Sequence, residues 1–134
     1  MNKLIADFTV LYTKLHTYHY NVVGPEFYSL HVMLEKEYDT FHEWIDEAAE
    51  SMKVDGEYPV ATVKEMLEIT SIKEAESRDY SSKEILEDLV SDYENLIAYM
   101  YEIKETLPMI QDNMLEEFIT YLQKQIWFFK ATLK

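Results

Sequence analysis

Apolar residues recur every three or four positions along most of the chain, which is the period of an amphipathic α-helix. Four long stretches show this period, and the first three end at residues that interrupt helices. They cover about residues 2–22 before Gly24-Pro25, about 26–54 before Asp55-Gly56, about 85–106 before Pro108, and a last stretch that runs nearly to the C-terminus. With only two glycines and three prolines, the chain has few breaks and is predicted to be all-α.

Residues 56–81 connect the second long helix to the third. Thr62 and Glu65 predict a capping box that opens a short helix through about Ile69, and the rest of the connection, including residues 78–82, is expected to be loop. Ser81 and Glu84 predict a second capping box, and Asp112 or Asn113 is expected to cap the last helix. The prediction is one domain over 1–134: a ferritin-like four-helix bundle with a short helix in the long crossover between helices 2 and 3.

The composition narrows the function. The chain has 134 residues, 48% of them hydrophobic, with no cysteine and no apolar run that fits a signal peptide or a membrane span, so we expect a soluble cytoplasmic protein. The 26 acidic and 12 basic residues give a formal charge of −14, which repels nucleic acid and anionic lipid and attracts cations. On charge alone, a merely well-solvated surface explains this excess equally well.

All four histidines lie in residues 16–42, close to acids at helical spacing. His31 and Glu35 are four residues apart, as are Asp46 and Glu50, so each pair shares one face of the second helix. The 11 residues from Glu35 to Asp46 span roughly 16 Å of helix, and the distance from His31 to Glu50 is roughly 28 Å. One helix therefore cannot bring both pairs to one ion.

A second copy of the helix removes this difficulty. If two copies pack antiparallel about a two-fold axis near residues 40 and 41, His31 of one lies level with Glu50 of the other, and Glu35 lies level with Asp46. Symmetric acidic pairs also arise by chance in so acidic a chain. Imidazole with carboxylates suits Fe(II), Zn(II) or Mn(II), and the Glu-x-x-His pairs of di-iron bundles do not occur.

The segment LHTYHYNVVGPEFYSLH, residues 15–31, resembles the signature of the Dps miniferritins. PVATVKEMLEITSIKE (59–74) resembles the family's crossover helix, and KQIWFFKATL (124–133) resembles its C-terminal end, so the resemblance covers nearly the whole chain. Carried over position by position, the family's metal ligands are His19, His31, Glu35, Asp46 and Glu50.

The resemblance implies a hollow homododecamer with ferroxidase sites shared across its two-fold interfaces. Iron is oxidised there from Fe2+ to Fe3+ by hydrogen peroxide or oxygen and stored inside as a mineral, which protects against oxidative damage. The family also lines three-fold pores for iron with carboxylates, near Asp112, Glu116 and Glu117 here. A helix start that favours anionic side chains explains these three acids equally well.

The chain departs from the family pattern in several places. Tyr20 stands where a tryptophan is common, which leaves open whether Tyr20, Tyr38 or Trp44 intercepts stray oxidising equivalents, and Glu35 replaces a frequent aspartate. There is no lysine-rich N-terminal tail, so no direct DNA binding is expected. A DNA-binding nucleoid protector and a ferritin-like structural protein with inactive sites are the alternatives. His16 and His42 are interpreted as ordinary hydrogen-bonding side chains.

Overall fold

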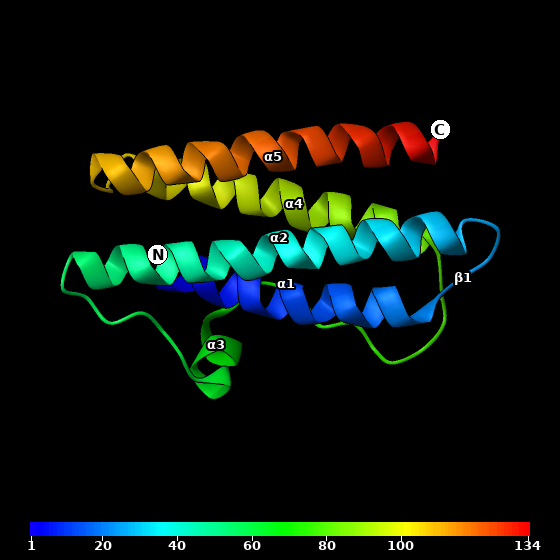
Figure 1. Ribbon diagram of the computed structural model, residues 1–134, viewed down its shortest axis with the longest axis horizontal. Helices are drawn as coiled ribbons and strands as arrows, with labels where there is room; N and C mark the ends of the chain where they lie inside the picture. Colours follow the sequence, from blue (N-terminus) through cyan, green and yellow to red (C-terminus); the bar gives the residue numbers. More distant parts are fainter. The chain divides into compact units, whose positions relative to one another are not determined.

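The computed structural model describes all 134 residues and contains five α-helices and one pair of very short strands (Figure 1). In chain order the elements are α1 (Asn2–Asn21), β1 (Val22–Val23), α2 (Phe27–Val54), α3 (Val63–Ile69), β2 (Tyr80–Ser81), α4 (Ser82–Lys104) and α5 (Met109–Leu133). The chain divides into two compact units, residues 1–82 and 83–134. None of the helices combines the length and the apolar character that crossing a membrane requires.

In the first unit, α1 and α2 pack antiparallel along most of their length. The ring of Phe8 on α1 lies 5.4 Å from that of Phe41 and 5.6 Å from that of Trp44, both on α2. The turn between the helices uses Gly24, whose φ of +110° lies in the region that favours glycine. The amide of Phe27 donates to the Gly24 carbonyl at 3.0 Å, so α2 starts directly beside the end of α1.

The crossover contains the predicted short helix. Thr62 is its N-cap: the Thr62 hydroxyl oxygen accepts from the Glu65 amide at 3.2 Å, and the hydroxyl donates to the Glu65 carboxylate at 2.6 Å. The crossover is tied to α1 beyond α3 by the buried carboxylate of Asp7. Asp7 accepts from the Thr70 hydroxyl at 2.7 Å, the Ser71 amide at 2.7 Å and hydroxyl at 3.2 Å, and the Lys3 ammonium at 2.8 Å.

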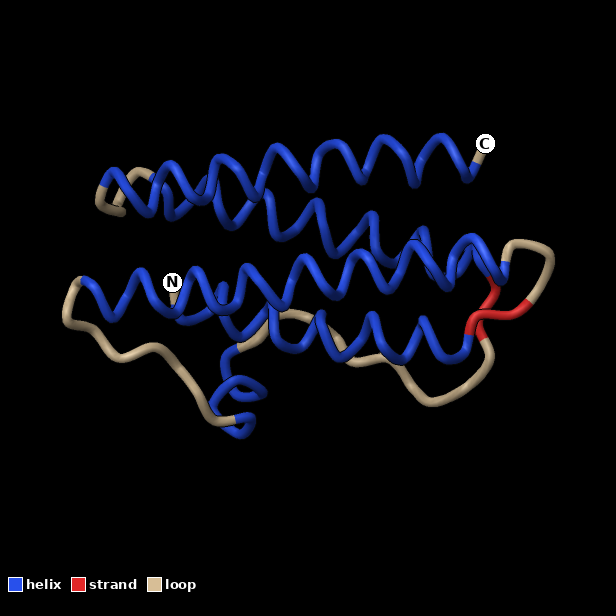
Figure 2. The backbone as a smooth tube through the Cα atoms, viewed as in Figure 1, coloured by secondary structure: helices blue, strands red, loops and turns tan.

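The prediction that residues 78–82 are loop holds for residues 78 and 79 but is wrong for residues 80–82. Tyr80–Ser81 forms β2, which pairs in parallel with β1, Val22 opposite Tyr80, and α4 already begins at Ser82 (Figure 2). The Tyr80 ring lies edge-on to Tyr18 at 4.8 Å, and the Arg78 guanidinium carbon lies over the Tyr80 ring, 3.9 Å from its centroid. Contacts between segments so far apart in sequence stabilise this pair, and local periodicity does not reveal them.

In the second unit, α4 and α5 run antiparallel. The rings of Tyr93 and Phe129 lie 5.6 Å apart, and the Lys130 ammonium pairs with Glu94 at 2.7 Å. The expected cap at Asp112 or Asn113 is wrong, because α5 begins at Met109 with Pro108 in the N-cap position. Proline fits there since it has no amide hydrogen to leave unpaired. Asp112 instead lies in the first helical turn.

Candidate metal centre

Two histidines, one from each helix of the first unit, form a reciprocal pair. Nδ1 of His19, near the end of α1, lies 2.7 Å from the carbonyl oxygen of His31, and Nδ1 of His31, near the start of α2, lies 2.8 Å from the carbonyl oxygen of His19. Their rings stack at 3.7 Å with an interplanar angle of 18°. The Gly24 turn and the β1–β2 pair hold the two helix ends in this position.

This pairing determines which nitrogen of each histidine is available to a metal. A carbonyl oxygen only accepts hydrogen bonds, so each Nδ1 carries the hydrogen and each Nε2 keeps its lone pair. Metal-binding histidines are commonly oriented in this way, with the other ring nitrogen donating to a carbonyl. The structure therefore brings together two predicted ligands, His19 and His31, with two parallel imidazole donors.

Glu35 lies one helical turn after His31 and is exposed. Its Oε1 accepts a hydrogen bond of 3.4 Å from the hydroxyl of Tyr38, and the Tyr38 ring stands edge-on to His19 at 5.3 Å. Burial, followed by the Glu35 and Asp39 carboxylates, raises the pKa of the Tyr38 hydroxyl above its ordinary value, which keeps it protonated as a donor at neutral pH. Glu35 thus lies on the same side of the helix pair as the histidines.

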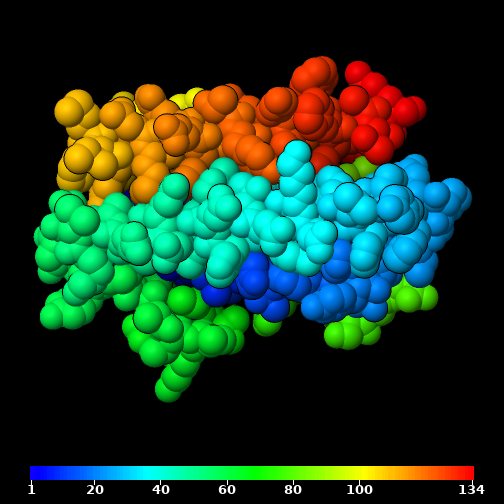
Figure 3. All heavy atoms as spheres, viewed as in Figure 1, coloured from blue at the N-terminus to red at the C-terminus, as the bar shows by residue number.

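Asp46 and Glu50 remain apart from the other three predicted ligands. Both are exposed on α2, and Asp46 lines a surface hollow with His42, Glu43, Ile45, Glu47 and Ala49. Figure 3 shows that side chains of α2 form part of the surface of the molecule on the face drawn there. Within one chain, no group of three histidine or acidic side chains is positioned to hold a metal. In one chain, Asp46 and Glu50 therefore stay apart from the His19–His31 pair, and the five ligands stay a prediction.

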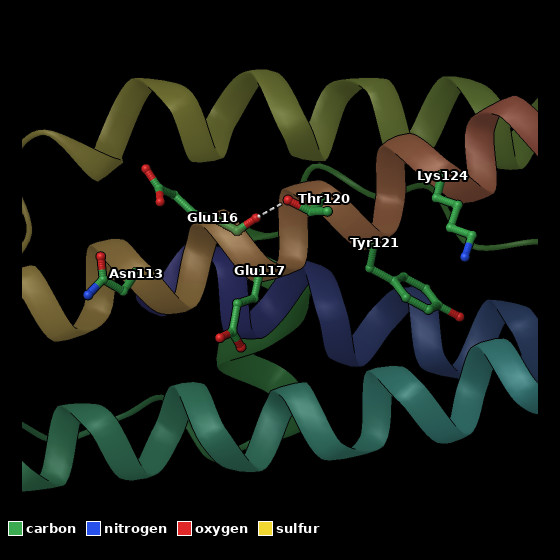
Figure 4. A pocket seen from close by; sticks show the side chains of 6 residues that line it. All are labelled: Asn113, Glu116, Glu117, Thr120, Tyr121 and Lys124. Atoms are coloured by element: carbon green, nitrogen blue, oxygen red, sulfur yellow. Dashed lines mark hydrogen bonds between the residues drawn. The ribbon is translucent and has the colours of Figure 1, made fainter.

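The acids predicted near a pore are partly neutralised by a lysine. The Lys104 ammonium lies 2.8 Å from Oδ1 of Asp112 and 3.2 Å from Oε1 of Glu116, and hydrogen bonds to these two carboxylates raise its pKa. Glu117 makes no ion pair, and it lines a shallow surface hollow on α5 with Asn113, Glu116, Thr120, Tyr121 and Lys124. Figure 4 shows Glu116 and Glu117 projecting from α5 in different directions. Lys104 carried no motif that identified it in the sequence.

The two remaining histidines, His16 and His42, lie on α1 and α2, the same helices as His19 and His31. His16 hydrogen-bonds through Nδ1 to the Tyr12 carbonyl oxygen at 2.8 Å and stacks on Tyr38 at 3.8 Å, and its interpretation as an ordinary hydrogen-bonding side chain stays a prediction. His42 is exposed, and its ring lies 5.8 Å from that of Tyr12.

Comparisons with known proteins agree on one family. Residues 1–134 match the family model described as a ferritin-like domain. The chain is 37% identical to DNA protection during starvation protein 2 of Bacillus anthracis, over 99% of this chain and 93% of that protein. It superimposes on the crystal structure of Dps from Staphylococcus aureus with a TM-score of 0.95 and 35% identity, covering 99% of this chain and 91% of the other.

A Dps protein from Vibrio cholerae O1 also superimposes, with a TM-score of 0.93 at 27% identity over 99% of this chain and 86% of that one. It is described as a member of a broad superfamily of ferritin-like diiron-carboxylate proteins. These likenesses confirm the predicted ferritin-like, all-α fold. The assignment of 1–134 to a single domain and the five ligands stay predictions.

Proposed function

Because this chain belongs to the Dps proteins of the ferritin-like family, we propose that it stores and detoxifies iron as a ferroxidase. The observation that carries the proposal is the His19–His31 pair, which presents two oriented imidazole nitrogens beside Glu35. Two imidazoles with carboxylates and no sulfur ligand suit ferrous iron, the substrate. Asp46 and Glu50 of a second copy complete the site by the antiparallel packing described above.

The chemistry consumes two ferrous ions for each peroxide. Two Fe2+ ions each give one electron to one hydrogen peroxide, whose O–O bond breaks, and two protons are taken up to release two waters and two Fe3+ ions. Because both electrons arrive from adjacent ions, no hydroxyl radical leaves the site. The protein supplies binding, orientation and negative charge, and the ferric product is stored inside a homododecameric cage.

The stoichiometry of the wild-type protein tests this function. We expect anaerobic loading with Fe(II), followed by hydrogen peroxide, to give a fast rise in ferric absorbance that saturates at about two Fe(II) oxidised per peroxide. A ratio of one with hydroxyl radical detected by a spin trap would contradict the proposal. Light scattering should give a mass near twelve times 16.0 kDa, whereas a stable monomer would contradict the shared site.

The family also makes DNA protection a candidate function, since curated relatives carry that name. The formal charge of −14 opposes direct contact with the phosphate backbone. We therefore expect no retardation of plasmid DNA in a gel shift at low salt without Mg2+. A retarded band that disappears on adding salt would contradict this expectation.

Iron is proposed to enter near Asp112, Glu116 and Glu117. Because Lys104 already pairs with Asp112 and Glu116, Glu117 carries the unpaired charge that attracts a cation. We expect Glu117→Gln to slow initial ferric formation roughly threefold at low ionic strength, and Glu116→Gln to slow it less. Stopped-flow absorbance at low and high salt measures both variants, and an equal effect at both salt concentrations would contradict an electrostatic role for Glu117.

A further inference from the structure

We propose that Tyr38 is a positioning residue of this site, and that its hydroxyl orients the Glu35 carboxylate toward the second iron. The inference rests on the proposed ferroxidase function and concerns which group sets the affinity of the second cation. It assigns a role to a side chain that binds neither the metal nor the oxidant.

Tyr38 contacts one proposed ligand on each helix. Its hydroxyl donates to Oε1 of Glu35 at 3.4 Å, and its ring stands at 88° to the His19 ring with 5.3 Å between centroids. The hydroxyl reaches back one turn along α2, while the ring edge reaches across to α1. Tyr38 therefore links the carboxylate half of the site to its imidazole half.

The Tyr38 ring is itself held from a second side. His16 stacks on it at 3.8 Å with an interplanar angle of 18°, and the Tyr12 ring meets it at 81° and 6.0 Å. His16 is fixed in turn because its Nδ1 donates to the Tyr12 carbonyl oxygen at 2.8 Å. With rings of α1 against it, the half-buried Tyr38 side chain has little freedom, so its hydroxyl is a fixed donor.

A fixed donor matters here because Glu35 is exposed and has three rotatable side-chain bonds. When Oε1 accepts from Tyr38, the carboxylate is held in one orientation and would offer the lone pairs of Oε2 to a cation. Without the hydroxyl, the carboxylate must be ordered by the cation alone, at a cost in affinity. Loss of an outer partner of this kind typically weakens metal binding about 10–100-fold.

Cobalt(II) binding to the assembled full-length protein tests the proposal, with anaerobic titration followed by visible absorption. Wild type is expected to show two phases, a tighter ion at His19 and His31 and a weaker ion that uses Glu35. Tyr38→Phe keeps the ring and its stacking but removes the donor, so the weaker phase should shift about tenfold while the tighter phase stays unchanged. His16→Ala should shift the same phase by less.

Tyr20→Phe is the matched control. The Tyr20 ring also lies near His19, at 5.7 Å, and near His16, at 5.9 Å, but the side chain is exposed and its hydroxyl makes no hydrogen bond to the site. This variant should bind cobalt as wild type does. Circular dichroism of each variant checks that the helices are retained.

Three results would overturn the proposal: Tyr38→Phe binds both ions as wild type does, Tyr20→Phe shifts the weaker phase equally, or wild type binds only one ion. His31→Ala separates this from the proposed function. If His31→Ala leaves the tighter phase unchanged, the ferroxidase assignment itself fails. If it removes that phase while Tyr38→Phe changes nothing, only the role of Tyr38 fails.

Discussion

Alanine in place of His31 is expected to remove the fast phase of ferric formation, and Asp46→Ala is expected to do the same. Each variant deletes a proposed metal ligand from one of the two halves of the site, so the loss should exceed the 10–100-fold typical of an outer partner. His31→Ala removes the bond from the His31 ring to the His19 carbonyl oxygen, whereas the bond that orients the His19 ring goes to the backbone carbonyl of residue 31 and is kept. Stopped-flow absorbance after anaerobic Fe(II) loading and hydrogen peroxide addition measures the rate.

Two neighbours on the same helix serve as controls. His42→Ala removes an exposed histidine outside the proposed ligand set, and Glu47→Ala removes an exposed acid next to Asp46. Both are expected to oxidise iron within about twofold of wild type. If Asp46→Ala and Glu47→Ala are equally slow, the effect comes from the general negative charge of α2, and Asp46 is not a ligand.

Asp7→Ala is expected to cost about 3 kcal/mol of folding stability. The Asp7 carboxylate is 1% exposed and accepts hydrogen bonds from Lys3, Thr70 and Ser71, which tie the crossover to α1. Alanine leaves the half-buried Thr70 and the exposed Ser71 without this acceptor, and hydrogen bonds to a charged group contribute about 1.5–3 kcal/mol each. Thermal unfolding followed by circular dichroism should show a midpoint lower by roughly 10 °C.

Glu87→Ala is the matched control for Asp7. Glu87 also pairs with a lysine four residues away, Lys83, but at 4.0 Å and with both side chains exposed. Exposed pairs of this kind contribute at most about 1 kcal/mol, so its midpoint should hardly move. Similar shifts in Asp7→Ala and Glu87→Ala would show that the crossover is not anchored by the buried carboxylate.

The long helices were predictable because their stabilising contacts repeat at helical spacing within each segment. The same holds for the cap at Thr62, whose partner Glu65 is three residues away. The start of α5 was missed because Pro108 was interpreted only as the end of the preceding helix, although proline also fits the N-terminal end of a helix. The β1–β2 pair was missed because Val22 and Tyr80 are far apart along the chain.

In the candidate site, too, local spacing was predictable from the sequence and contacts between separate segments were not. Spacing along one helix was enough to propose His31, Glu35, Asp46 and Glu50 as two half-sites. It could not reveal that His19 and His31 hydrogen-bond to each other's carbonyl groups, because that depends on how the turn at Gly24 brings two helix ends together. The contacts of Lys104 with Asp112 and Glu116 likewise exist only once α4 and α5 are packed.

The central claim is that each site takes its histidines from one copy of the chain and Asp46 from another. Co-expression of His31→Ala and Asp46→Ala chains in equal amounts tests it most directly. In a mixed pair, one site carries both substitutions and the other carries neither, so random pairing should restore about a quarter of the wild-type fast phase. If the mixed cages stay as inactive as either single variant, the ligands come from one chain and the shared site is wrong.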